Sequence, residues 1–433
     1  MRAEIGILIL LLLLPAAASG AGAPHPETLT LEQAVERALS YHPSLRSRKD
    51  AIEAAAQGRK SAEARRWLRA DLTAQAERHS DPVAVLPIKG WGQFPEFSRD
   101  IYLWELRLSL PLYEGGRIAK EVKLKELETK VQESLLRQST EDLIANVKQV
   151  FYQILYLQEL LGAQEQIVGL LRRQKEEAEL KYRLGRTARL DLLYMERALK
   201  EEEALKTATA ENLALARRIL AMLIGLEGDD FRLQGRLALQ EELEMEEECR
   251  DCIDMRPDVA AAELKVHQAH TSLERAIREY LPSISLFSSY GRRAGSGLHY
   301  DEEVWTSGLR LDLNLFESGA TRSRIRQARA QLSAAKEELR AVKLKARQEI
   351  ASAASRIKAA RAKLQQYMAA QQYAEEAYRV ESVKYRTGAG AVTDLLSAQE
   401  AWLRARSALL RAYFDLRSAQ VAYELAAGRI AGS

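Results

Sequence analysis

An internal duplication constrains this 433-residue chain more than any other feature of its sequence. Residues 106–116 read Leu-Arg-Leu-Ser-Leu-Pro-Leu-Tyr-Glu-Gly-Gly, and residues 309–319 read Leu-Arg-Leu-Asp-Leu-Asn-Leu-Phe-Glu-Ser-Gly, with seven identities in eleven positions. The same offset of 203 residues relates Lys-Tyr-Arg-Leu-Gly at 181–185 to Lys-Tyr-Arg-Thr-Gly at 384–388. Because the offset is the same for both motifs, we predict two structural copies, and we expect that neither copy has an insertion between its two motifs.

Two long stretches without proline predict unusually long helices. All ten prolines lie outside residues 112–256 and 283–433, and an interior proline would break a helix. Residues 116–182 carry apolar side chains at steps of three and four, and residues 190–223 form an amphipathic return segment. At about 1.5 Å per residue, the first segment gives a helix of roughly 100 Å. Each copy is therefore predicted to contain a long helical hairpin rather than a compact globule.

Two segments of alternating polarity precede each long helix. We expect strands at residues 70–77 and 102–112 in the first copy, and at 283–290 and 305–315 in the second. One apolar and one charged face are found in half-exposed soluble sheets and in membrane β-barrels. The predicted apolar face, which would contact lipid in a barrel, includes Trp104, Leu106, Leu108, Leu110, Trp305, Leu309, Leu311 and Leu313.

The N-terminal sequence predicts export from the cytoplasm. Residues 1–23 combine an apolar run with small residues near a cleavage site, as secretory signal peptides do. The apolar run, residues 7–14, is too short to span a bilayer, and the rest of the chain also lacks the roughly 20 consecutive apolar residues of a transmembrane helix. The exported protein is therefore either soluble or crosses a membrane by β-strands.

The aromatic residues Trp91 and Phe94 lie in the loop between the first two predicted strands. They fit an aromatic belt at a membrane interface, and they equally fit packing onto their own sheet.

Composition and motifs argue against several functional classes. Lys and Arg number 64 against 61 Asp and Glu, a net charge of +3, so we do not expect a nucleic-acid-binding protein. We predict that the chain is not an enzyme, because no recognisable nucleophile–base or paired-carboxylate motif appears. We also expect no cofactor and no metal. Cys249 and Cys252 suit a local disulfide in an oxidising compartment, and His267 and His270 suit two solvated side chains.

The number of strands predicts assembly of several chains. Four strands are too few to close a barrel, and an open sheet in lipid leaves edge N–H and C=O groups unpaired. Two chains would supply eight strands, and three would supply twelve. We expect a homotrimer, because twelve long helices around one axis leave an aqueous lumen, but the sequence alone also permits other numbers.

The duplicated motifs resemble those of the TolC-like outer-membrane efflux proteins. The Leu-x-Leu-[Tyr/Phe]-Glu-x-Gly junctions ending at Gly116 and Gly319, and the Lys-Tyr-Arg-x-Gly turns at Gly185 and Gly388, carry this resemblance. It implies a mainly α fold with a small β part: a long α-helical barrel through the periplasm and a transmembrane β-barrel in the outer membrane of a Gram-negative type cell. The β-barrel would have four strands per protomer and twelve in a trimer.

The resemblance also implies a function and a division of the chain. Such proteins are passive exit ducts of tripartite efflux or type I secretion systems, opened by a periplasmic adaptor protein and an inner-membrane transporter. Residues 24–227 would form the first repeat, 228–256 an equatorial linker, and 257–433 the second repeat. An exported coiled-coil scaffold or a periplasmic adaptor subunit is the alternative, but it would leave the paired strands unexplained.

The family's functional positions map onto the two turns. The resemblance assigns adaptor docking to Gly185, Gly388, Leu190 and Thr393. It assigns the pore entrance to Asp191 and Asp394, although both also suit N-capping of the helix after the turn. One turn further on, Tyr194 and Ser397 stand where many family members carry a second acidic residue, so a double acidic ring is absent. The candidates for a latch that holds the entrance closed are Tyr182, Tyr385, Arg186 and Arg189.

Overall fold

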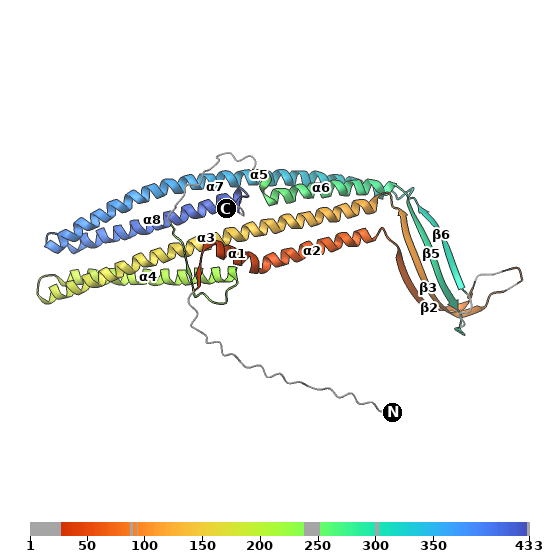
Figure 1. Cartoon of the computed structure of the whole chain (residues 1–433), viewed down its shortest axis with the longest axis horizontal. Coiled ribbons are helices and arrows are strands. Elements are labelled where there is room, and N and C mark those ends of the chain that lie inside the picture. Colours follow the sequence, from red (N-terminus) through yellow and green to blue (C-terminus); the bar gives the residue numbers. More distant parts are fainter. Residues whose placement is uncertain (1–26, 87–89, 93, 238–251, 299–302, 431–433) are drawn as a thin grey trace, which may run out of the picture.

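The computed structural model describes residues 27–86, 90–92, 94–237, 252–298 and 303–430 (Figure 1). The predicted signal peptide, residues 1–23, lies outside the described residues. The first copy contains α2 (Pro43–Ala64), β2 (Arg69–Ala84), β3 (Phe97–Tyr113), α3 (Arg117–Arg183) and α4 (Arg189–Ile224). The second copy contains α6 (Pro257–Ile277), β5 (Ser283–Ala294), β6 (Glu303–Asp312), α7 (Ala320–Thr387) and α8 (Val392–Ala426). In the described part of the chain, none of the helices is both long and apolar enough to span a bilayer.

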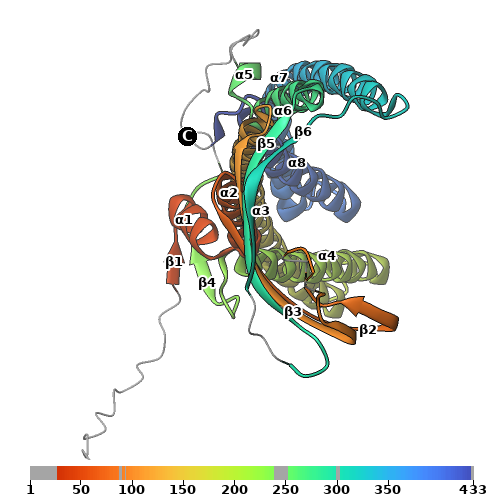
Figure 2. The ribbon, with the colours of Figure 1, turned by 90° about the vertical axis from the view of Figure 1, so that its right-hand side faces the viewer.

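The long helices dominate the molecule and form two hairpins that lie side by side (Figure 1). Helix α3 has 67 residues and α7 has 68, so each is about 100 Å long. Helix α3 also packs along α8 of the other hairpin, where Lys148 Nζ lies 2.9 Å from Glu424 Oε2 in a largely buried ion pair. Viewed from the sheet end, the hairpins follow a curved path behind the sheet (Figure 2). The predicted pair of long hairpins is confirmed.

The four strands form one antiparallel sheet at one end of the helices, in the order β2-β3-β5-β6. Directly opposed residues share a face of a sheet, so the register creates apolar rows across it. One row runs from Leu72 through Leu106 and Tyr290 to Trp305. Its two end residues are 72% and 69% exposed, so this apolar face is not covered by any other part of the described chain.

Strand β6 is shorter than predicted. It ends at Asp312, which pairs with Ser283, the first residue of β5. Leu313 therefore follows the strand, and the expectation that it belongs to the strand is wrong. The reason is that Pro282 precedes β5 and has no backbone N–H, so the ladder has no partner beyond this point. The strands of the first copy are longer than predicted, with 16 residues in β2 and 17 in β3.

The junctions between strand and long helix use left-handed backbone in both copies. Gly115 and Gly116 have φ angles of +59° and +73°, and the corresponding residues Ser318 and Gly319 have +51° and +84°. Glycine adopts this region without the Cβ clash that disfavours it for other residues. The duplicated Glu-x-Gly motif is therefore a backbone device that turns the chain from the sheet into the helix.

Several short elements lie beside the long helices, and the sequence did not reveal the two three-residue strands among them. Strand β1 (Glu27–Leu29) pairs in parallel with β4 (Phe231–Leu233), and α1 (Leu31–Tyr41) follows with a capping box formed by Thr30 and Gln33. Helix α5 (Cys252–Met255) and the 3₁₀ turn η1 (Arg278–Tyr280) flank α6. Cys252 is buried and disulfide-bonded, and its expected partner Cys249 lies outside the described residues.

Candidate functional site

The two hairpin turns have the same backbone design. Gly185 and Gly388 have φ angles of +69° and +79°, and no atom lies within 4 Å of where a Cβ would stand. In the first turn Arg186 N–H donates to the Lys181 carbonyl at 2.8 Å, and in the second Ala389 N–H donates to the Lys384 carbonyl at 2.9 Å. These bonds close the helix ends in the manner of a Schellman motif. The glycines are thus helix caps, and both turns present an open surface.

The two aspartates lie in the first turn of the return helices. The N-cap residues are Ala188 and Ala391, neither of which caps through its side chain, so Asp191 and Asp394 are not N-caps. Both stand at the third helical position, where the helix dipole favours a negative charge. Asp191 accepts a hydrogen bond of 2.8 Å from the Thr187 hydroxyl, whereas the Asp394 side chain is exposed.

Tyr385 is the predicted latch residue that the structure places at the contact between the hairpins. It packs against a cluster in which Ala178 and Met195 of the first hairpin meet Val392 and Leu395 of the second. Burial raises the pKa of the Tyr385 phenol, and the nearby carboxylates of Asp191 and Glu177 raise it further. The structure therefore brings Tyr385 and Asp191, from different copies, close together.

The other predicted site residues are distributed over the surface of the turns. Tyr182 is 43% exposed, and Arg186, Arg189 and Leu190 are exposed as well. Among the described residues, neither arginine forms an ion pair with Asp191 or Asp394. Three predicted residues of the return helices, namely Tyr194, Thr393 and Ser397, line a shared cavity between the hairpins.

Sequence reasoning missed two residues of this site. Lys181 Nζ lies 4.6 Å from the centre of the Tyr385 ring, a cation–π contact between hairpins. Thr187 donates the hydrogen bond that orients Asp191. Lys181 belongs to the repeated Lys-Tyr-Arg motif, but its partner lies on the other copy, and nothing in the local sequence indicates that pairing.

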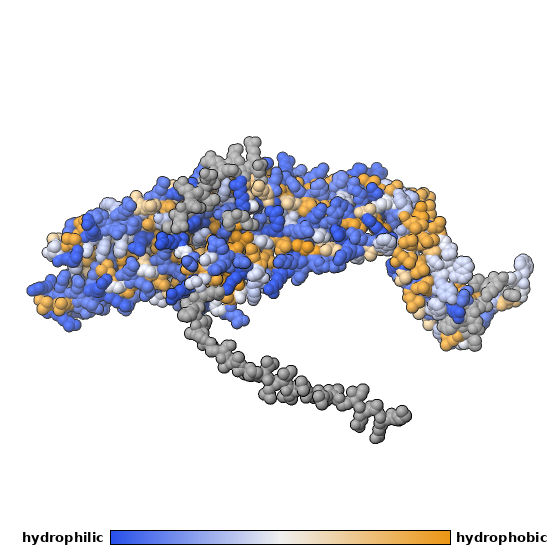
Figure 3. Space-filling view, viewed as in Figure 1, coloured by the Kyte–Doolittle hydropathy of each residue, from blue (hydrophilic) through white to orange (hydrophobic). Residues whose placement is uncertain are grey.

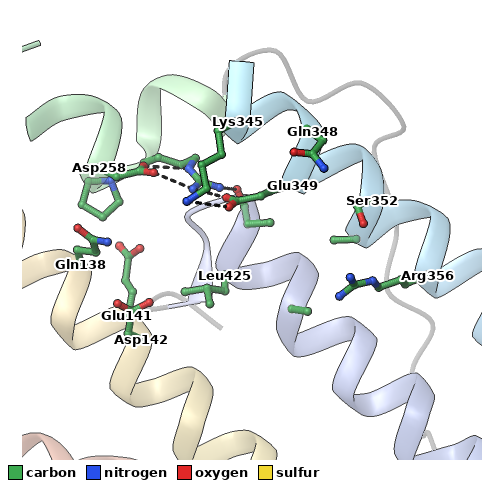
Figure 4. A pocket seen from close by; sticks show the side chains of 15 residues that line it. Gln138, Glu141, Asp142, Asp258, Lys345, Gln348, Glu349, Ser352, Arg356 and Leu425 are labelled. Carbon is green, nitrogen blue, oxygen red and sulfur yellow. Dashed lines mark hydrogen bonds and ion pairs between the residues drawn. The ribbon is translucent and has the colours of Figure 1, made fainter. Parts of the chain in front are cut away.

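A second charged region lies at the middle of the molecule, where α3, α6, α7 and α8 surround a cavity of about 480 Å³ (Figure 4). Arg256 is buried there, and its Nη2 lies 2.8 Å from Asp258 Oδ2 and 2.6 Å from Glu349 Oε2. Its Nη1 donates to the Ala426 carbonyl at 2.9 Å, so one guanidinium joins three helices. Figure 4 shows Glu141 on the opposite helix, α3. Burial raises the pKa of this carboxyl, which is only 4% exposed.

Comparison with known proteins agrees with this architecture. A family model described as "Outer membrane efflux protein" matches residues 34–226 and 250–429, which is most of the chain. The chain belongs to the outer membrane efflux protein family. It is also 25% identical over 302 residues to Protein CyaE of Bordetella pertussis, a match that covers 68% of this chain. The chain spans 63% of the length of that relative.

Solved structures of outer-membrane channels share the fold of this outer membrane efflux protein. The CmeC channel of Campylobacter jejuni is 18% identical with a TM-score of 0.80, and the match covers 92% of this chain and 85% of CmeC. The outer membrane protein VceC of Vibrio cholerae is 21% identical with a TM-score of 0.76, and the match covers 92% of this chain and 96% of VceC. Across almost its whole length, the chain has the fold of a channel-tunnel protein.

Family membership determines where the protein acts and what kind of protein it is. An outer membrane efflux protein resides in the outer membrane and extends into the periplasm, and its family is one of channels rather than enzymes.

The exposed apolar face of the sheet is visible as a hydrophobic area beside the more hydrophilic helices (Figure 3). Besides Trp305, this face of β6 exposes Leu309 and Leu311 by 68% and 64%.

Proposed function

We propose that this outer membrane efflux protein is a homotrimeric channel-tunnel, the passive exit duct of a tripartite efflux or type I secretion system. The observation that carries the proposal is the four-stranded sheet, which has one exposed apolar face and two open edges, β2 and β6. Lipid would cover the apolar face, in which Trp104 contacts Tyr290 edge to face at 5.9 Å. The open edges would pair with those of neighbouring copies.

The edges favour a closed ring of copies. In hydrocarbon an unpaired backbone N–H or C=O costs several kcal/mol, so β2 of one copy must pair with β6 of the next. Two copies would give eight strands and eight long helices, and three would give twelve of each. We favour three, because eight packed helices leave little room for a water-filled passage along the axis. The ten residues of β6 match a tilted transmembrane strand of about 9–11 residues.

The helical turns would form the periplasmic entrance. Asp191 and Asp394 would contribute six carboxylates in a trimer and would favour cations there. Tyr385, with Tyr182, Arg186 and Arg189 nearby, would hold the entrance closed. The exposed turn residues Gly185, Leu190, Gly388 and Thr393 would receive the adaptor protein, which together with an inner-membrane transporter would open the duct.

A pair of substitutions on the two faces of β6 tests the proposal. Leu309→Arg places a charge on the proposed lipid face, which costs about 2–4 kcal/mol near the bilayer midplane. Thr306→Arg places the same charge on the opposite face. We expect heat-modifiable trimers of the wild type and of Thr306→Arg in outer-membrane fractions, and loss of trimers for Leu309→Arg. Cross-linking that stops at two subunits, or a water-soluble monomer, would contradict the proposal.

A further inference from the structure

A cavity of about 360 Å³ lies between α3, α4 and α8, a short distance from the turns. Its walls are partly apolar, formed by Ile167, Leu171, Leu205, Leu396 and Leu403. All of these helices belong to one chain, so the cavity is complete in a single protomer. A volume of this size is within the range of sites that hold small molecules.

Two buried polar side chains that line this cavity have unused hydrogen-bonding groups. Glu202 is only 6% exposed, and its Oε1 has no hydrogen-bond partner. Gln399 is 3% exposed, and neither Oε1 nor Nε2 of its amide has a partner. A buried polar group without a partner destabilises the folded protein, and an unpaired carboxylate does so more strongly. Burial accordingly raises the pKa of the Glu202 carboxyl.

The neighbouring cations of the described chain are engaged elsewhere. Arg197 also lines the cavity, but its Nε lies 3.6 Å from Glu201, and its side chain is 71% exposed. Lys206, one turn after Glu202, pairs with Glu165 at 3.1 Å. The carboxylate of Glu202 thus faces a partly apolar cavity without a counter-ion among the described residues.

We propose that this cavity is a binding site for a small primary alkylammonium ion. The ammonium group would donate hydrogen bonds to the Glu202 carboxylate and to the Gln399 Oε1 atom. The alkyl chain would lie against Ile167 and Leu396, which a bare metal ion would leave uncovered. An ammonium has three N–H donors and no acceptor, so it can donate to both of these oxygens at once.

The duplication supplies an internal comparison for this site. At the offset of 203 residues, Glu202 corresponds to Ala405, and Gln399 corresponds to Glu196. Glu196 pairs with Lys175 at 3.2 Å within its own hairpin. The second copy therefore lacks the unpaired carboxylate, and each chain carries the site once.

Binding of n-butylammonium to the purified full-length protein in detergent tests this inference. Trp402 packs against the cluster that contains Ile167 and Leu171, and its ring stacks on Tyr378 at 5.3 Å, so we expect its fluorescence to respond to a ligand in the cavity. We expect a saturable change that is lost in Trp402→Phe. The neutral isostere n-butanol, which enters detergent micelles as well, should give no saturable change.

Matched variants identify the binding group. Glu202→Gln should weaken butylammonium binding by at least about tenfold, because the neutral amide no longer balances the cation. Glu211→Gln, at an exposed carboxylate further along α4 that does not line the cavity, should leave binding unchanged. Glu202→Gln should melt at the same or a higher temperature than the wild type, which would exclude misfolding. If it does not assemble, Gln399→Leu is the replacement variant, with the same expected loss of binding.

Several results would overturn the inference. These are the absence of saturable binding, equal responses to butylammonium and butanol, or unchanged affinity in both Glu202→Gln and Gln399→Leu. A lysine side chain on a partner would offer the same ammonium group. Saturable binding of N-acetyl-lysine methylamide without binding of butylammonium would therefore assign the cavity to a peptide and contradict a site for free amines.

Discussion

The Lys181 ammonium lies over the Tyr385 ring, with Nζ 4.6 Å from the ring centre, and so joins the ends of two hairpins that are far apart in the sequence. The lysine is on α3 of the first copy, and the tyrosine is on α7 of the second. Asp191 is close enough to the same phenol to raise its pKa. The contact links the two turns within one chain.

Removing this cation should loosen both turns. In Lys181→Met the stem is kept and the charge is lost, which removes an interaction worth about 0.5–1 kcal/mol. We expect amide hydrogen exchange at residues 181–193 and 385–396 to become about two- to fivefold faster. The control is Lys384→Met, because Lys384 pairs with Glu381 on its own helix. Equal effects of the two variants would contradict a specific role for Lys181.

The double variant Asp191→Ala with Asp394→Ala should raise single-channel conductance in planar bilayers. The substitutions remove six carboxylates per trimer and the Thr187–Asp191 hydrogen bond, and we expect this loss to loosen the closed entrance that we propose. Asp229→Ala, an exposed position after α4, serves as the control and should conduct as the wild type does. Unchanged conductance of the double variant would count against an entrance formed by these aspartates.

Gly388→Trp should weaken docking of the adaptor without preventing trimer assembly. A side chain at this position is disfavoured by the φ angle of +79°, and indole would project into the open space beside the turn. Gly388→Asn is the matched control, because asparagine tolerates left-handed backbone. We expect adaptor co-purification to fall for the tryptophan variant and to persist for asparagine. Normal pump complementation by Gly388→Trp would show that docking occurs elsewhere.

Ser318→Gly should stabilise the protein by about 1 kcal/mol, because it relieves left-handed backbone at a residue with a Cβ. The first copy already has Gly115 at the corresponding position. The reverse change, Gly115→Ala, should destabilise more strongly, because its Cβ would stand 2.8 Å from Leu281 Cβ as well. Thermal denaturation followed by circular dichroism measures both. A lower melting temperature for Ser318→Gly would refute the strain argument.

Glu141→Gln should stabilise the protein at pH 7. Burial raises the pKa of Glu141 above its ordinary value of 4.5, so the folded protein holds this proton more tightly than the unfolded chain. Stability from this group is therefore complete below about pH 4.5 and falls as the pH rises through the folded pKa. The gain from glutamine should be absent at pH 4 and present at pH 7. Melting temperatures at both values provide the measurement, and a gain of equal size at both would exclude Glu141 ionisation as its cause.

Much of the fold is predictable from the sequence because its signals are local. The helix period over residues 116–182, the alternation around Leu106 and Leu108, and the turn glycines Gly185 and Gly388 each depend on neighbouring residues only. The end of β6 was mispredicted because apolar alternation continues past Asp312, whereas pairing stops where β5 begins. The three-residue strands β1 and β4 were missed because so short a segment shows no period.

The sequence by itself determined the duplication, the two hairpins, the amphipathic strands and the positions of Asp191 and Asp394 at the turns. Only the tertiary structure decided that β3 pairs with β5, that Lys181 contacts Tyr385, and that Glu202 and Gln399 line one cavity. These relationships join the two copies, and their partners are far apart in the chain. Side-chain periodicity shows which face of a helix or strand is apolar, but the packing of complete helices and strands selects the residues that meet there.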